Sequence, residues 1–397
     1  MIRKKRFSAA FIFSTCILVA LTLALGGCGN SGAGKTYKIG VILSLSGPAA
    51  PLGQSEQRSI QLLEKDLQKG NGINGGKIQF IIEDDESDPA KANVAASKLI
   101  DQEGVAAIIG CSSTGSTLAI APTVKKKQIP CVAMAAGTAV TQPTEKWLFS
   151  VAPSDALVVQ RILMYFRDEL KVKNVAILHD SNAYGTGGAD VFSAQAPKYG
   201  IKVVANESYG SADTDMTAQL TKITQAPAKA ILVWGTNPGP ASIAKNMQQL
   251  NIKIPFVASS GIANQKFIEL AGPAANGVVF AASRLILPST IPAGSDWEKA
   301  VNDFSSEYKA AYNMSIDTFA AHGWDAGNMI VNAMKKAGTE GTDIRDQIEQ
   351  VRDYPGVDGV FTYSPTNHAG LKVDALIMVK IVNDQWTQDK PSGGSSK

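Results

Sequence analysis

Three adjacent hydroxyl side chains are the residues whose types and spacing most suggest ligand chemistry. Ser112, Ser113 and Thr114 directly follow an apolar run at 108–110 and precede a helical pattern that starts at Thr117. Serine and threonine are favoured N-cap residues, and a helix start offers free N–H groups and partial positive charge to an anion. The pattern predicts either an anion-binding helix start or side chains that only cap their own helix. Periodicity alone favours the second interpretation.

Groups that could catalyse a reaction are scattered along the chain. The histidines His179, His322 and His368 lie in separate motifs, and the sequence has no H-E-x-x-H, G-x-S-x-G or C-x-x-C pattern. We interpret His179 and His322 as structural. The acidic run at 83–85 could serve acid–base chemistry or bind a cation, but its place before Ser-Asp-Pro favours a solvated turn that caps the next helix. We therefore expect no enzyme, no metal and no cofactor.

Residues 29–36 match the phosphate-loop pattern G-x-x-x-x-G-K-S/T. A working phosphate loop follows a buried strand and opens a helix, so that its N–H groups face the phosphates. Here the segment follows Cys28 and precedes a strand-like run at 37–43. We interpret residues 28–36 as a lipid anchor and flexible spacer.

The N-terminus is typical of an exported protein. Residues 3–6 are basic, residues 7–25 are apolar or small, and Leu25-Gly26-Gly27 precedes Cys28. This ending resembles the lipobox of bacterial lipoproteins, which implies that residues 1–27 are a signal peptide and that Cys28 carries lipid. The alternative is an uncleaved membrane anchor, since the apolar run is about long enough to span a bilayer. Both interpretations place the mature chain outside the cytoplasm, attached to a membrane.

The charge of the mature chain limits its classes of partner, and its cysteines leave two redox states open. Of 38 basic and 35 acidic residues, the leader holds four basic and none acidic, which leaves 34 against 35. The mature chain is therefore not basic, and we expect no nucleic-acid partner. Cys111 and Cys131 border apolar runs, so a disulfide and two buried free thiols both remain open.

Apolar runs alternate with amphipathic stretches over most of the mature chain. This alternation predicts an α/β fold with two doubly wound, mostly parallel sheets and a change of lobe near 150–155. A polar tail at 389–397 is expected to be disordered. The expected strands are 37–44, 77–83, 105–110, 130–134, 174–179, 201–206, 229–234, 254–258, 277–281, 357–363 and 374–382. The expected helices include 53–69, 88–102, 155–169, 184–198, 239–250, 294–311 and 316–336.

Six segments together resemble type I periplasmic binding proteins, in particular the branched-chain amino-acid-binding proteins of ABC transporters. They are ILSLSGPAAPLG at 42–53, EDDESDPA at 83–90, IGCSST at 109–114, HDSNAYG at 179–185, TFAAHGWD at 318–325 and NHAG at 367–370. The resemblance covers residues 37–385. It implies two lobes joined by three hinge crossovers, one formed by 37–155 plus 285–362 and the other by 156–284 plus 363–388.

The resemblance also implies a ligand site. Ser113 and Thr114 match the position that grips a carboxylate, and Tyr184 matches an aromatic residue that covers the ligand. Leu52 stands where the family often has an aromatic wall, which implies a roomier or more apolar pocket. In the neighbouring loop, Ala135, Gly137 and Thr138 match residues that contact the same head group; the family threonine aligns with Gly137, and Thr138 follows it.

Two residues near strand ends could line the cleft or serve only the structure. They are Trp234, which ends a strand, and Asn237 in the loop after it. Ser260 departs from the family pattern, because amino-acid binders have a glutamate there that pairs with the ligand's ammonium. No acid lies nearby in sequence, and an unpaired buried ammonium costs several kcal/mol. We therefore hypothesise that the ligand is a small organic acid with an apolar or aromatic body, rather than leucine.

The expected function follows from the resemblance. A monomeric, lipid-anchored binding protein would close two lobes on an organic acid or amino acid and deliver it to an ABC permease. The same fold can also serve as a ligand-sensing module for a membrane signalling partner. A permease and an ATPase encoded beside the gene would favour transport, and a sensor kinase would favour signalling.

Overall fold

The computed structural model describes residues 35–70, 72, 73 and 75–389, of which those from Thr36 on belong to one compact unit. The predicted signal peptide, the lipidation site at Cys28 and most of the spacer lie outside these residues, as do positions 390–397 of the predicted tail. Within the described ranges, no helix combines the length and apolarity needed to cross a membrane.

The first sheet has five parallel strands in the order β2-β1-β3-β4-β5. The apolar runs of β1, β3, β4 and β5 are buried, as expected for a parallel sheet covered by helices, whereas the edge strand β2 is only partly buried. The strands are β1 (Thr36–Leu43), β2 (Lys77–Asp84), β3 (Ile108–Gly110), β4 (Cys131–Ala133) and β5 (Leu148–Ser150). The helices between them are α2 (Ala50–Lys69), α3 (Pro89–Asp101), α4 (Thr114–Lys127) and α5 (Thr138–Thr141).

The second sheet has seven strands in the order β14-β13-β10-β9-β8-β6-β7. Strand β13 pairs antiparallel with both β10 and β14, and the other pairs are parallel. The strands are β6 (Asn174–Asp180), β7 (Lys202–Tyr209), β8 (Ala230–Trp234), β9 (Phe256–Ala258), β10 (Val279–Ser283), β13 (Leu376–Val382) and β14 (Gln385–Gln388). The accompanying helices are α6 (Asp155–Met164), α7 (Ala183–Gln195), α8 (Thr217–Gln225), α9 (Gly239–Gln249) and α10 (Gln265–Ala271).

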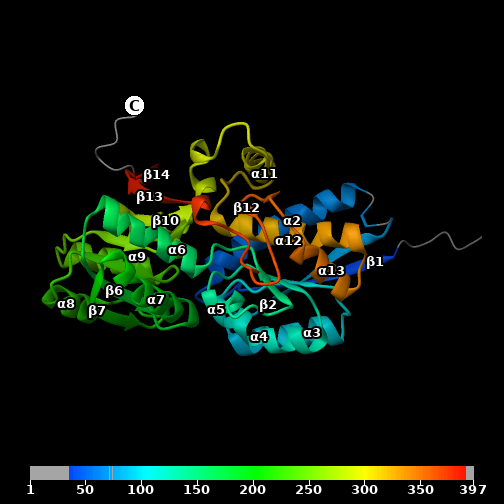
Figure 1. The fold of residues 1–397 in the computed structure, drawn as a ribbon, viewed down its shortest axis with the longest axis horizontal. Coiled ribbons are helices and arrows are strands. Elements are labelled where there is room, and N and C mark those ends of the chain that lie inside the picture. The colour runs from blue at the N-terminus through cyan, green and yellow to red at the C-terminus, as the bar shows by residue number, and fades with distance from the viewer. Residues whose placement is uncertain (1–34, 71, 74, 390–397) are drawn as a thin grey trace, which may run out of the picture. The chain divides into compact units, whose positions relative to one another are not determined.

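The chain passes between the two sheets three times: after β5, after β10 and before β13. Between the last two passages it forms α11 (Asp296–Tyr312), α12 (Thr318–Ala337), α13 (Gly341–Glu349), and the short pair β11 (Tyr354–Pro355) and β12 (Val360–Phe361). Helix α12 lies beside α2, which is far away in sequence (Figure 1). A Cβ at Gly323 would come within 2.7 Å of the Glu56 carbonyl, so this glycine permits the close approach.

The predicted fold class, with its two mostly parallel sheets, is confirmed. Several short elements were not predicted from the sequence, among them β5, β14, α8, α10 and α13. The expected strand at 357–363 is only the two-residue β12, and the expected helix at 155–169 continues past Met164 as a π-helical turn. Cys111 and Cys131 are buried free thiols, which is the second of the two alternatives left open. The exact lobe boundaries stay a prediction.

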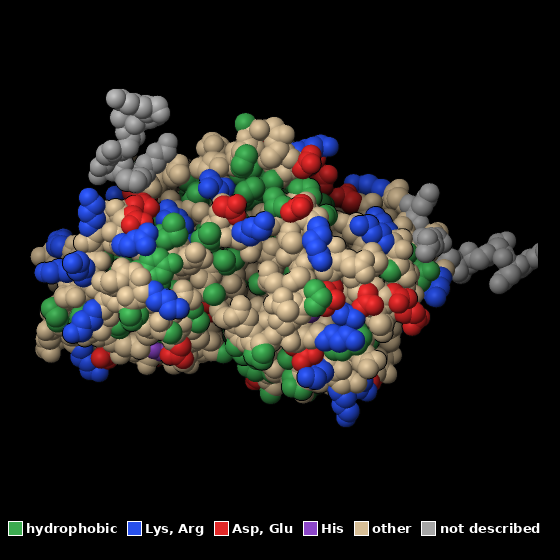
Figure 2. Space-filling view, in the orientation of Figure 1, with side chains coloured by type: hydrophobic (Ala, Val, Ile, Leu, Met, Phe, Trp, Pro, Cys, Tyr) green, Lys and Arg blue, Asp and Glu red, His purple; other side chains and the backbone are tan. Residues whose placement is uncertain are grey.

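Charged side chains are dispersed on the face shown in Figure 2, where lysine and arginine alternate with aspartate and glutamate. A surface of mixed sign produces no extended field of one sign that would steer a charged ligand from a distance.

Candidate ligand-binding site

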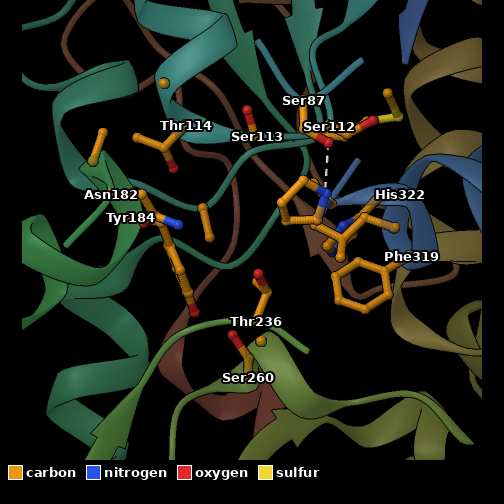
Figure 3. A pocket seen from close by; sticks show the side chains of 18 of the residues that line it. Ser87, Ser112, Ser113, Thr114, Asn182, Tyr184, Thr236, Ser260, Phe319 and His322 are labelled. Carbon is orange, nitrogen blue, oxygen red and sulfur yellow. Dashed lines mark hydrogen bonds between the residues drawn. The ribbon is translucent and has the colours of Figure 1, made fainter. Parts of the chain in front are cut away.

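A cavity of about 350 Å³ is lined by residues that follow strands of both sheets and by the start of α12 (Figure 3). Its volume falls at the lower end of small-molecule pockets, roughly 300 to 1,000 Å³. The lining residues are Pro48, Ala49, Leu52, Ser87, Pro89, Ser112, Ser113, Thr114, Gly115, Met134, Ala136, Pro153, Asn182, Ala183, Tyr184, Ser211, Thr236, Ser260, Gly261, Thr318, Phe319 and His322.

The start of α4 brings the predicted hydroxyl groups to the cavity. Ser113 is the N-cap and accepts a hydrogen bond from the Ser116 N–H at 3.3 Å. Thr114 is buried, and its Oγ1 accepts the Gly137 N–H at 3.2 Å. Ser113 therefore caps its helix and also lines the cavity, so the two interpretations of this motif do not exclude each other. The helix dipole adds partial positive charge on this side.

Ser112 lines the same wall and is joined to a buried acid. Its Oγ accepts the Ser44 N–H at 3.1 Å and shares a short hydrogen bond with Oε2 of Glu56. The Glu56 side chain is completely buried on α2, and burial raises its pKa to about 8. Sequence reasoning missed this acid, although Glu56 stands one turn after Leu52 on the face of α2 that carries apolar residues.

The opposite wall is formed by the start of α7 and by loops after β8 and β9. Asn182 caps α7 by accepting the Gly185 N–H at 2.9 Å, which places Tyr184 in the first turn. Tyr184 is 8% exposed, and its hydroxyl makes no hydrogen bond within the described residues. Ser260 also lines this wall, as Figure 3 shows. Tyr184 and Ser260 therefore occupy the predicted cavity-facing positions.

An apolar wall completes the cavity. Leu52 contributes from α2, Met134 from the end of β4 and Phe319 from α12. His322, which we interpreted as structural, also lines this wall and packs edge-on against Phe319. Its Nε2 lies 3.3 Å from Oδ2 of buried Asp358, but neither ring nitrogen has a hydrogen bond of good geometry within the described residues. The α12 wall was not among the site residues predicted from sequence.

Five predicted site residues do not line the cavity. Ala136 lines it in their place within the loop after β4, beside Ala135 and Gly137. The Oγ1 of Thr138 accepts the Ala156 N–H at 3.1 Å. Trp234 is fully buried behind Tyr184, with ring centroids 6.0 Å apart.

The fifth, Asn237, donates from Nδ2 to Oδ1 of Asn264 at 3.1 Å, within buried structure. Asn237 and Trp234 therefore make structural contacts, although Asn237 Oδ1 and Trp234 Nε1 are buried without a hydrogen-bond partner among the described residues. Direct ligand contact by any of the five stays a prediction.

The structure places a second unpredicted acid near this site. Asp155 is fully buried in the first turn of α6, and neither carboxylate oxygen has a hydrogen-bond partner among the described residues. Burial raises the pKa of Asp155 well above its usual range. The Asp155 charge in turn helps to raise the pKa of the Tyr184 hydroxyl, after the larger effect of burial. The sequence pattern Ser154-Asp155 resembles an ordinary helix start, which is why it gave no signal.

The model of the periplasmic binding protein family matches residues 36–385. Among curated relatives, a Leu/Ile/Val-binding protein homologue of Brucella melitensis is 24% identical over 83% of this chain and 87% of its own length. A leucine-, isoleucine-, valine-, threonine- and alanine-binding protein of Pseudomonas aeruginosa is 23% identical over 81% of this chain and 84% of its own length.

Solved structures of similar proteins agree with this match. An extracellular ligand-binding receptor from Rhodopseudomonas palustris HaA2 has a TM-score of 0.82 at 30% identity, covering 89% of this chain and 99% of its own. The branched-chain amino acid transporter substrate-binding protein LivJ from Streptococcus pneumoniae, in complex with isoleucine, has a TM-score of 0.79 at 26% identity, covering 89% and 98%.

Proposed function

The chain belongs to the periplasmic binding protein family, and on this premise we propose that it captures a small carboxylate-bearing solute and delivers it to an ABC permease. It is a solute-binding protein and not an enzyme. The observation that carries the proposal is the cavity between hydroxyl groups at the start of α4 and the Tyr184 and Ser260 wall.

The start of α4 suits a carboxylate. Its free N–H groups and the hydroxyls of Ser112, Ser113 and Thr114 converge on one wall, where an anion also gains from the helix dipole. Hydrogen bonds to a charged group contribute about 1.5 to 3 kcal/mol each, so two or three such bonds fix the orientation of the head group.

The remaining walls suit an apolar body. Leu52, Met134 and Phe319 present hydrocarbon surface, and burying apolar ligand surface against them contributes about 25 cal/mol per Å². We propose an aromatic or branched aliphatic acid as the ligand, because Ser260 supplies no negative charge for an ammonium group.

A second candidate ligand is a branched-chain amino acid. Asp155 favours it, because this buried carboxylate has no hydrogen-bond partner among the described residues. Its charge, after the larger effect of burial, helps to raise the pKa of Tyr184 on the cavity wall. A ligand ammonium would supply the missing positive charge. Relatives named as leucine-, isoleucine- and valine-binding proteins also support this candidate.

Calorimetry separates the two candidates. Titrations with leucine, isoleucine and valine beside benzoate and short aliphatic acids show which class binds. Tight leucine binding without acid binding would eliminate the organic-acid candidate. In that case Asp155→Asn should weaken leucine at least tenfold, whereas an organic acid should bind Asp155→Asn no worse than the wild type. Failure of all these probes would contradict the proposed ligand class.

Delivery requires attachment and a partner. We propose that Cys28 carries the lipid that keeps the monomer near its permease, a position supported by the leader that precedes it. Mass spectrometry of the membrane-extracted protein would detect the lipid on an N-terminal Cys28, and Cys28→Ala should release the protein from the membrane. A sensing role remains the alternative; loss of solute uptake on deletion of the gene favours transport.

A further inference from the structure

The Ser112 hydroxyl occupies an unusual hydrogen-bonding position on the cavity wall. It is 3% exposed, lines the cavity, accepts the Ser44 N–H at 3.1 Å and shares a short hydrogen bond with Glu56 Oε2. A hydroxyl has one hydrogen and two acceptor positions. The Ser44 N–H fills one acceptor position, so the state of Glu56 decides how the other two are used.

Two arrangements are possible. If Glu56 is ionised, it can only accept, so Ser112 gives its single hydrogen to Glu56 and has only a lone pair left for the cavity. A ligand carboxylate would then meet a lone pair. If Glu56 is protonated, its O–H fills the second acceptor position of Ser112, and the Ser112 hydrogen is free to bond a ligand carboxylate.

The surroundings of Glu56 favour the protonated form. Its side chain is 0% exposed on α2, and its Oε1 has no hydrogen-bond partner within the described residues. Desolvation raises its pKa most; the Ser112 bond lowers it, and the nearby charges of Asp85 and Asp317 raise it again, which gives about 8.

Acidic groups, a thiol and one arginine lie on the elements around Glu56. Asp85 follows β2 and Asp317 caps α12, while Cys111 precedes Ser112. Burial raises the pKa of Asp317, and Arg58 and His322 lower it. The Ser55 hydroxyl donates a hydrogen bond to the Asp317 carboxylate at 2.7 Å. The Arg58 guanidinium also donates to that hydroxyl at 2.9 Å.

We propose that protonated Glu56 is a positioning residue that turns the Ser112 hydroxyl into a hydrogen-bond donor for the ligand carboxylate. This inference rests on the proposed function. Binding at a pH where free Glu56 is ionised then takes up one proton from solvent onto Glu56. Affinity should consequently fall about tenfold per pH unit above the Glu56 pKa.

The test compares wild type with Glu56→Gln, whose amide can donate to Ser112 at any pH. Calorimetry follows whichever of leucine or benzoate binds at pH 6.5, from pH 6 to 9.5 and in buffers of different ionisation enthalpy. The ratio of Glu56→Gln to wild-type affinity cancels titration of the probe itself and should rise about tenfold between pH 8.5 and 9.5, with more proton uptake in wild type than in Glu56→Gln. A constant ratio would overturn the proposal.

Two further variants and one direct measurement sharpen the result. Glu64→Gln, on the same helix, should keep the wild-type pH profile, because Glu64 only accepts the Phe80 N–H. Ser112→Ala should bind about tenfold or more weakly at pH 6.5 and lose most of the alkaline decline. Carbon-13 NMR of labelled glutamate, assigned with Glu56→Gln, should show Glu56 titrating near pH 8.

The outcomes separate this inference from the proposed function. If no carboxylate probe binds at pH 6.5, the proposed function fails, and the NMR titration still decides the protonation of Glu56. If a probe binds and Glu56 titrates near its ordinary value of 4.5, the proposed function stands and this inference is wrong.

Discussion

At the scale of single residues, the candidate site has one polar wall and one apolar wall. Ser112, Ser113 and Thr114 concentrate donors at one helix start, whereas Leu52 and Phe319 present only hydrocarbon. Such a division fixes the orientation of a ligand through a few hydrogen bonds and leaves affinity for its body to burial. Small substitutions on each wall should therefore have distinct effects.

Thr114→Val should weaken carboxylate binding about 10- to 100-fold. The substitution removes a cavity hydroxyl and leaves the buried Gly137 N–H without its acceptor. Calorimetry with the best-binding probe measures the change. Thr123→Val on the same helix is the matched control, because its hydroxyl bonds Asn93 and does not line the cavity. Equal losses in both variants would exclude a role for Thr114 in the site.

Glu56 should make the folded protein less stable as pH rises. Its folded pKa of about 8 lies above its ordinary value of 4.5, so between these values the unfolded chain releases a proton that the folded chain keeps. The free energy of unfolding should therefore decline through this window and level off above pH 8, by about 5 kcal/mol at most. Urea unfolding of wild type and Glu56→Gln at pH 5 and 8.5 tests this; parallel pH curves would contradict it.

At the scale of elements, the contact between α2 and α12 positions part of the apolar wall of the site. Helix α2 carries Leu52 and Glu56, and α12 carries Phe319 and His322. Gly323 lets the two backbones approach closely, since any Cβ there would collide with the Glu56 backbone. Movement of α12 would therefore shift the apolar wall relative to Ser112.

Gly323→Ala should destabilise the protein by about 1 to 3 kcal/mol and weaken ligand binding, because two backbones must separate. Gly327→Ala is the comparison on the same helix. The added Cβ there meets the end of the flexible Leu63 side chain, which can rotate away, so its cost should be smaller. Urea unfolding and calorimetry measure both effects. An equal or larger loss in Gly327→Ala would refute this account of the contact.

At the scale of the whole molecule, the cavity draws its walls from segments on both sides of three chain crossings. A ligand that bonds the start of α4 and also contacts Tyr184 and Ser260 would favour a closed arrangement over an open one. The closure equilibrium can shift only by the ligand's difference in affinity for the two states.

Small-angle scattering should show a smaller radius of gyration when a tight ligand is added. Tyr184→Ala should bind at least tenfold more weakly and show less compaction at equal occupancy, because it removes contact area on one side only. Tyr199→Ala serves as the control, since Tyr199 packs against Arg167 and does not line the cavity. Unchanged scattering with a saturating ligand would contradict closure.

The sequence by itself determined the fold class and the hydroxyl start of α4. Alternating apolar runs and helical periodicity are local patterns, and a cap such as Ser113 lies next to the helix that it starts. Short elements such as β5 were not predicted, because a three-residue strand with two apolar side chains gives little periodic signal. The family resemblance predicted Tyr184 and Leu52 as site residues, because both match motif positions of the family.

Only the tertiary structure decided which distant residues share the site. It placed Glu56 within hydrogen-bonding distance of Ser112, Asp155 near Tyr184, and the start of α12 on the apolar wall. These residues come from segments whose proximity depends on sheet order and helix packing, which local spacing does not encode. The two buried acids resemble ordinary helix residues in the sequence, and their pKa values are raised mainly by the desolvation that folding imposes.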